Sequence, residues 1–248
     1  MNSSLRLYRR EAPGGRFISF TVKVKETDLW IAINQRSYSE DLVSATEKAV
    51  FKIRRPLEQY LASNPYLQSA LEPCLIDPDA PPIFLEMVRA ANKAGVGPMA
   101  AVAGVVAEKV GLFLLEIAEE VIVENGGDLF LKVNEPVSVG IFAGASVLSG
   151  KLALQIEPGQ TPIGICTSSS TVGPSLSFGR ADAATAVAPS AALADAVATA
   201  LGNRVSGEED LQQAITFARE IDGLTGALLI IGDKIAAWGD INLQPLGN

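Results

Sequence analysis

The chain has 248 residues, of which 48% are hydrophobic and 19% charged, and its formal net charge is −8. This acidic balance argues against a nucleic-acid partner, and the charges inside the longest apolar stretch, Met99 to Val123, argue against a membrane span. Without histidine and with only two distant cysteines, the sequence disfavours a histidine-activated nucleophile, a disulfide framework and a structural zinc site. We expect a soluble cytoplasmic protein of one domain over 1–248, in which oxygen atoms hold any metal, as they hold magnesium, calcium or manganese.

The spacing of apolar residues predicts alternating groups of helices and antiparallel strands. The predicted elements of the first part are a β-hairpin over 16–33 with a turn at 25–28, a helix over 39–62, a loop with one short helical turn over 63–82, and a helix over 83–94 that stops at Gly95. Those of the second part are a long Ala- and Val-rich helix from about Pro98, a hairpin over 121–133, strands over 138–144, 151–157, 161–169 and 181–189, an Ala-rich helix from Pro189, a helix over 208–221 and a hairpin over 226–239.

Self-comparison suggests an internal duplication. The segment PMAAVAGVVAEKVG at 98–111 aligns without gaps on PSAALADAVATALG at 189–202, with seven of fourteen positions identical. Two Ala-rich helices can match through composition alone, and duplication of a helix-plus-hairpin unit is the alternative. We expect an α+β fold of mostly antiparallel sheets with packed helices, two pseudo-repeats at roughly 95–150 and 185–240, and an N-terminal hairpin with helices over 15–95.

Two polar side chains share one face of the second Ala-rich helix. Asp195 and Thr199 are four residues apart, so a carboxylate and a hydroxyl lie one turn apart on the same side. Both offer oxygen ligands of the kind that a hard divalent cation requires. An aspartate among Ala and Val must find either a cation or hydrogen-bond donors, and the spacing alone leaves both readings open.

A glycine-rich turn is the second candidate. Asn125, Gly126, Gly127 and Asp128 join two predicted strands, and Gly-Gly permits a positive φ. It also lets a ligand approach the backbone without a Cβ in the way. The turn is a structural feature first, and its use as a cofactor-binding site is the further hypothesis.

The stretch GICTSSSTVGPSLSFGRADA, residues 164–183, raises a third possibility. Its hydroxyl run begins with Thr167, Ser168, Ser169 and Ser170 at a predicted strand end and could bind phosphate oxygens without a Walker motif. Cys166 is either a small core residue or a catalytic nucleophile whose pKa its surroundings lower. Arg180 is either a phosphate clamp or a partner of Asp182 in a surface ion pair.

Together these residues resemble the ApbE superfamily of flavin transferases. The resemblance rests on VIVENGGDLFL, GICTSSSTVGPSLSFGRADA and LADAVATALG, in that order, and covers roughly residues 95 to 240. It implies an enzyme that binds FAD and magnesium, moves the FMN half onto a Ser or Thr hydroxyl of an acceptor protein and releases AMP. By the same resemblance Asp195 and Thr199 bind the metal, 125–128 lie near the flavin, and 167–169 match the superfamily's TSG strand end.

Two elements of the superfamily are absent. Its HxxDPxTG segment has no counterpart, since the chain lacks histidine, and its AKG element is replaced by VAG at Val102 to Gly104. Three hypotheses therefore remain: a magnesium-dependent FMN transferase, a Cys166-based sulfur carrier or thiol-dependent enzyme, and a non-catalytic module that binds a flavin, a nucleotide or a partner protein. An exposed sheet edge or Ala-rich helix face could support a homodimer. The short basic run of Lys52, Arg54 and Arg55 is either a solvated helix face or an anion contact.

Overall fold

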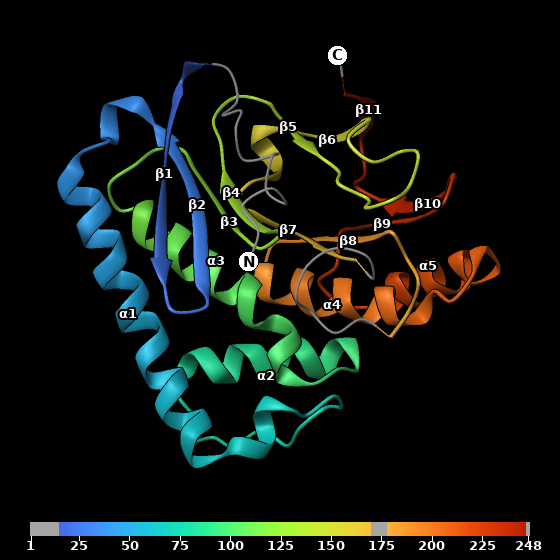
Figure 1. Ribbon diagram of the computed structural model, residues 1–248, viewed down its shortest axis with the longest axis horizontal. Helices are drawn as coiled ribbons and strands as arrows, with labels where there is room; N and C mark the ends of the chain where they lie inside the picture. The colour runs from blue at the N-terminus through green and yellow to red at the C-terminus, as the bar shows by residue number, and fades with distance from the viewer. Residues whose placement is uncertain (1–14, 170–177, 247–248) are drawn as a thin grey trace.

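An eight-stranded antiparallel sheet forms the centre of the molecule (Figure 1). The computed structural model describes residues 15–169 and 178–246. The strands of this sheet, in spatial order, are β1 (Phe17–Val24), β2 (Thr27–Asn34), β3 (Val121–Asn125), β4 (Asp128–Lys132), β7 (Ile163–Ser168), β8 (Ala183–Ala188), β9 (Gly226–Ile231) and β10 (Lys234–Gly239). Every neighbouring pair is antiparallel, which confirms the predicted α+β class and the three predicted hairpins.

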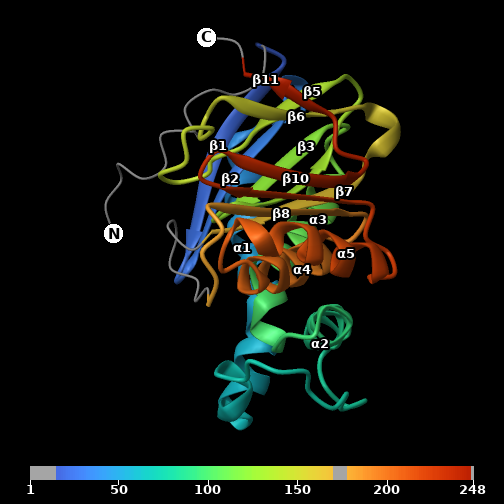
Figure 2. The ribbon, with the colours of Figure 1, turned by 90° about the vertical axis from the view of Figure 1, so that its right-hand side faces the viewer.

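A smaller sheet covers one face of the large one (Figure 2). It consists of β11 (Leu243–Pro245), β6 (Leu152–Ile156) and β5 (Val137–Gly140), in that spatial order. A continuous apolar layer lies between the two sheets and includes Leu131, Leu154, Ile165 and Leu228, all buried. The sequence did not predict β11, because three residues after the last hairpin are too few for a periodicity signal.

Helices cover the opposite face of the large sheet. They are α1 (Glu40–Ser63), α2 (Pro82–Ala94), α3 (Val102–Leu114), α4 (Ala191–Arg204) and α5 (Leu211–Glu220). The helices α3 and α4 pack directly on the strands, and α2 lies beyond them as a further layer (Figure 2). The larger apolar cluster fills the space between these helices and the sheet.

Local sequence explains most helix boundaries. The side chain of Ser39 accepts a hydrogen bond from the Leu42 amide and caps α1, while Gly95 ends α2 in a left-handed conformation with φ of 72°. The predicted helix from Pro98 is wrong at its start, because Pro98–Ala101 form a 3₁₀ turn and α3 begins at Val102. The amide of Ala100 bonds the carbonyl of Gly97 three residues back in this turn.

Several connections meet at one end of the large sheet, which we call the turn end. They are the β1–β2 turn at 25–26, the β3–β4 turn at 126–127 and the β9–β10 turn at 232–233, and β7 ends beside them at Ser168. The register places Leu29 opposite Asn125, Asp128 opposite Cys166 and Ser168 opposite Ala184, so the candidate motifs from distant parts of the sequence gather at this end.

Both segments of the proposed duplication include a helix that is followed by a hairpin. The helices α3 and α4 pack against each other, and the hairpins β3–β4 and β9–β10 belong to the same sheet. The duplication itself stays a prediction. Within the described part of the chain, no single helix is long and apolar enough to cross a membrane, although α2 and the 98–114 segment pass that test as a pair bent by 105°.

Candidate functional site

The Gly-Gly turn is fixed by its neighbours. Gly126 and Gly127 have φ values of 73° and 113°, which side-chain-bearing residues rarely adopt. The buried side chain of Glu124 accepts a hydrogen bond of 2.8 Å from the Gly127 amide, and Asn125 Nδ2 donates to the Ala103 carbonyl at 3.1 Å. The turn is therefore tied to α3 as well as to its own hairpin.

Asp128 begins β4 and lies beside Cys166, its partner in the ladder. Burial raises the pKa of the Asp128 carboxyl to about 7; a hydrogen bond from the Cys166 thiol opposes this rise and the negative charge of Glu124 adds to it. Near neutral pH both the protonated and the ionised form of this carboxyl are therefore populated, which is unusual for an aspartate.

Asp195 caps another helix from its position inside α4. Its Oδ2 accepts a hydrogen bond of 2.8 Å from the Gly104 amide, in the first turn of α3. The helices are close because Gly104 has no side chain: a Cβ there would lie 2.2 Å from the Ala191 carbonyl oxygen and 2.8 Å from the Asp195 Cβ. The structural interpretation of Asp195, a carboxylate bonded to a nearby amide, therefore has an observed hydrogen bond behind it.

The negative charge around Asp195 is nevertheless poorly compensated. Its side chain is buried, and burial together with the charge of Asp128 holds its pKa well above the usual range, although amides of Gly104 and Ala103 lower it. Two carboxyls, one on β4 and one on α4, are thus close enough for the charge of one to raise the pKa of the other. A divalent metal bound here would relieve that repulsion.

The thiolate hypothesis required a lowered pKa for Cys166, and the structure gives the opposite. The thiol is fully buried and donates a hydrogen bond to the Ala191 carbonyl at 3.4 Å. Burial raises its pKa well above the ordinary value, and the charges of Asp128 and Asp195 raise it further. The thiol stays protonated near neutral pH, which disfavours Cys166 as a nucleophile or persulfide carrier.

The hydroxyl run begins at the end of a strand, as predicted, and this strand ends at the turn end of the sheet. Thr167 and Ser168 end β7 and Ser169 follows it, while Ser170 lies outside the described residues. The hydroxyl of Thr167 lies 2.8 Å from that of Thr185 on β8, so the two share a hydrogen bond. Ser168 lies against α4, near Gly202.

Arg180 and Asp182 have separate environments. Asp182 Oδ2 accepts a hydrogen bond of 2.7 Å from the Gly232 amide and so ties the β8 entrance to the β9–β10 turn. The backbone amide of Arg180 bonds the carbonyl of Val205 after α4, and its side chain is exposed. An exposed guanidinium at the turn end suits the phosphate-clamp reading, which stays a prediction.

The carboxylate and hydroxyl oxygens here fit a magnesium ion whose remaining ligands would come from a nucleotide. Asp195 and the half-buried Thr199 lie one turn apart on α4, and Asp128 adds a second carboxylate. In the described residues no group of three or more His, Cys, Asp or Glu side chains is arranged to hold a metal. Magnesium is ordinarily held by one or two carboxylates together with waters and substrate phosphates, so such a site would be completed by its ligand.

Sequence reasoning missed the residues that support the site. Glu108 Oε2 accepts hydrogen bonds from the Ala191 amide at 2.7 Å and the Ser190 hydroxyl at 3.3 Å, which caps α4 from α3. Glu124 fixes the Gly-Gly turn. A possible signal for Glu124 was its position immediately before NGGD, whereas the Glu108 contact spans over 80 residues and has no local signal.

Comparison with known proteins gives the family. A family model described as "AbpE bacteria" matches residues 9–237. The chain belongs to this family. A UPF0280 protein of Methanocella arvoryzae is 49% identical over 195 residues, covering 77% of this chain and 78% of the relative. A UPF0280 protein of Methanosarcina barkeri is 42% identical over 229 residues, covering 90% and 88%.

Solved structures show the fold of this AbpE bacteria family member. The flavin transferase ApbE from Vibrio cholerae matches with a TM-score of 0.54 and 15% identity, covering 90% of this chain and 96% of that one. The ApbE protein from Thermotoga maritima matches with a TM-score of 0.55 and 12% identity, covering 89% and 96%. The resemblance to the ApbE superfamily is thereby confirmed in sequence family and in fold.

Proposed function

We propose that this protein binds a flavin dinucleotide together with a magnesium ion at the turn end of the large sheet. The observation that carries the proposal is the pair of carboxyls of Asp128 and Asp195, whose pKa values are both raised. The pair lies beside the Gly126-Gly127 turn, where no Cβ blocks the backbone. A diphosphate and a divalent cation have the charges that such a pair and its surrounding hydroxyls can accommodate.

Asp195 and Thr199 would hold the cation, with Asp128 close enough to add to its field. The cation would neutralise charge on the diphosphate. The chain's own groups would then position the ligand: Gly126 and Gly127 leave the backbone open to close approach, and the hydroxyls at 167–169 offer donors to phosphate oxygens.

Transfer of FMN is the finer part of the proposal. In such a transfer an acceptor hydroxyl attacks the FMN phosphorus, the phosphoanhydride bond to AMP breaks, and the hydroxyl proton passes to a base. The superfamily resemblance supports this reaction, but Ala103 stands at the position of the superfamily's AKG lysine. Its carbonyl is held by Asn125, so the backbone part of that element has a partner here.

The test is calorimetric titration of FAD into the protein with magnesium and with EDTA. Thr199→Val removes the hydroxyl at nearly constant volume, and Asp195→Asn preserves an acceptor for the Gly104 amide. We expect magnesium-dependent binding that weakens at least tenfold in each variant. Chromatography would then detect AMP and FMN released from FAD. These products would show that the FMN half is transferred to water when no acceptor protein is present.

Thr216→Val is the matched control, because Thr216 is an exposed hydroxyl on α5 that bonds only its own helix at Gln212 in the described contacts. Binding by the control should equal that of the wild type. Absence of FAD binding with and without magnesium, or binding that EDTA leaves unchanged, would refute the proposal. Binding without AMP release would retain the ligand site and refute the transfer step.

A further inference from the structure

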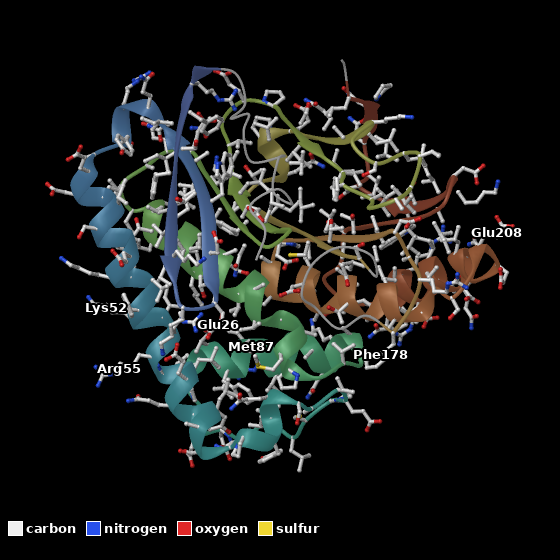
Figure 3. The ribbon with its side chains drawn as sticks, in the orientation of Figure 1. Glu26, Lys52, Arg55, Met87, Phe178 and Glu208 are labelled. Carbon is white, nitrogen blue, oxygen red and sulfur yellow. The ribbon has the colours of Figure 1, made fainter. Side chains whose placement is uncertain are left out.

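A basic stripe on α1 has no role in the site described above. Lys48, Lys52 and Arg55 follow one another at four- and three-residue steps, so all three project from one side of the helix. All three are exposed, and Figure 3 shows Lys52 and Arg55 pointing away from the body of the molecule. In the described part of the chain no ion pair involves any of them.

The stripe borders a hollow of about 350 Å³ on the protein surface. The residues that line it are Lys25, Phe51, Lys52, Arg54, Arg55 and Glu58. Glu58 is its one carboxylate, and that charge is already paired with Lys25 and with Arg54 Nε, the latter at 2.9 Å. Arg54 also pairs with Glu26 at 2.6 Å, so the excess positive charge of the hollow comes from Lys52 and Arg55, in a chain whose net charge is −8.

Two further features suit a ligand with both apolar and polar groups. Phe51 is 51% exposed and forms an apolar wall beside the cations. Pro56 lies inside α1 and has no amide hydrogen, so the carbonyl of Lys52, four residues earlier, lacks its helical donor.

We propose that this stripe and hollow bind a short acidic segment of a partner protein, with an aromatic or aliphatic side chain against Phe51. From Lys48 to Arg55 the helix rises about 10 Å, which three or four extended residues can span. At physiological salt, screening limits charge interactions to a Debye length of about 8 Å. A short acidic segment therefore interacts mainly with the cations of the stripe and not with the acidic surface farther away. A long polyanion or an anionic membrane would extend over the acidic remainder of the surface.

Fluorescence anisotropy with a labelled peptide tests the proposal without any flavin ligand. The probe is the hexapeptide Glu-Glu-Phe-Glu-Glu-Leu, with a matched peptide in which every Glu is replaced by Gln. The variant is Lys52→Glu with Arg55→Glu, and the control is Lys151→Glu with Arg219→Glu, which changes net charge equally at exposed positions elsewhere. We expect the variant to bind the acidic peptide at least tenfold more weakly than the wild type and the control to bind within twofold of it.

Higher salt should weaken wild-type binding, and Phe51→Ala should weaken it severalfold while leaving the salt dependence unchanged. Circular dichroism confirms that each variant is folded. Equal binding of the Gln peptide, or equal losses in variant and control, would overturn the proposal. Tighter binding of a duplex DNA or of phosphatidylserine vesicles than of the peptide would overturn it as well, because either would assign the stripe to a different partner.

Discussion

The ionisation of Asp128 makes the stability of the molecule depend on pH near neutrality. Its pKa of about 7 in the folded protein exceeds the value of about 3.9 expected in an unfolded chain. The folded state therefore binds this proton more tightly, and the stability that protonation gives is complete below about pH 4 and is lost as the pH rises through 7. The ionised carboxyl of Asp128 therefore lowers the free energy of unfolding while it places a negative charge at the site.

Asp128→Asn should remove this cost. In EDTA the wild type should lose stability between pH 5 and pH 8, and the variant should lose at least about 1 kcal/mol less, which is about 2–4 °C in melting temperature. Thermal melts at the two pH values measure the difference. Asp240→Asn, at an exposed position, is the control and should follow the wild type. Parallel pH profiles for wild type and Asp128→Asn would contradict the burial argument.

Gly104 shows how a missing side chain can matter. A Cβ at this position would overlap the Ala191 carbonyl, which belongs to backbone and cannot rotate away. We expect Gly104→Ala to lower the free energy of unfolding by at least about 2 kcal/mol, measured by chemical denaturation. Gly159→Ala is the matched control, because a Cβ at Gly159 would have nothing within 4 Å and its φ is not positive. Equal stability of the two variants would show that α3 and α4 can separate without cost.

At the scale of elements, α3 and α4 cap one another. Asp195 of α4 accepts from an amide in the first turn of α3, and Glu108 of α3 accepts from the Ala191 amide at the start of α4. Each carboxylate lies near the positive end of the other helix's dipole. Hydrogen bonds to both side chains therefore hold the two helices together where Gly104 of α3 approaches Ala191 of α4.

Glu108→Ala should cost about 1–2 kcal/mol, since removal of a helix cap of this kind typically costs that much. Glu108→Gln keeps an acceptor and should recover part of the loss. Urea unfolding of both variants measures this, with the exposed Glu116→Ala as control. If Ala and Gln variants were equally stable, the hydrogen bonds to α4 would contribute nothing.

At the scale of the whole molecule, the C-terminal strand β11 completes one edge of the small sheet. Leu243 pairs with Leu154, and the Leu246 amide bonds the carbonyl of Lys151. The small sheet in turn covers one apolar face of the large sheet. Its edge is therefore completed by the last residues that the structure describes.

Deletion of residues 240–248 should loosen the small sheet first. Hydrogen exchange is expected to accelerate in β5 and β6 at least tenfold, while β4 and β7, at the centre of the large sheet, keep most of their protection. Mass spectrometry of peptides from each strand measures this. Uniform acceleration in both sheets would instead mean that the two layers unfold as one unit.

The sequence predicted the hairpins well, because alternation and turn glycines are local signals. The motifs chosen as candidate sites stay predictions, and antiparallel pairing explains why Asp128, Cys166 and the hydroxyls at 167–169 lie at one end. The sequence left the state of Cys166 open, since the pKa of a thiol depends on burial and on carboxyls from other elements. Contacts such as Glu108 with Ala191 join positions far apart in sequence and have no periodic signature.

The bond between Asp195 and the Gly104 amide affects how natural or laboratory variation in this chain should be interpreted. A library screened for soluble abundance would penalise Asp195 because a helix loses its cap, even if no ligand were ever bound. Thr199 is half-buried and caps no helix in the described contacts, so the same screen would tolerate substitutions at this position. Only a second screen for ligand retention would separate the two positions, so the difference between the scores, rather than either alone, would map the site.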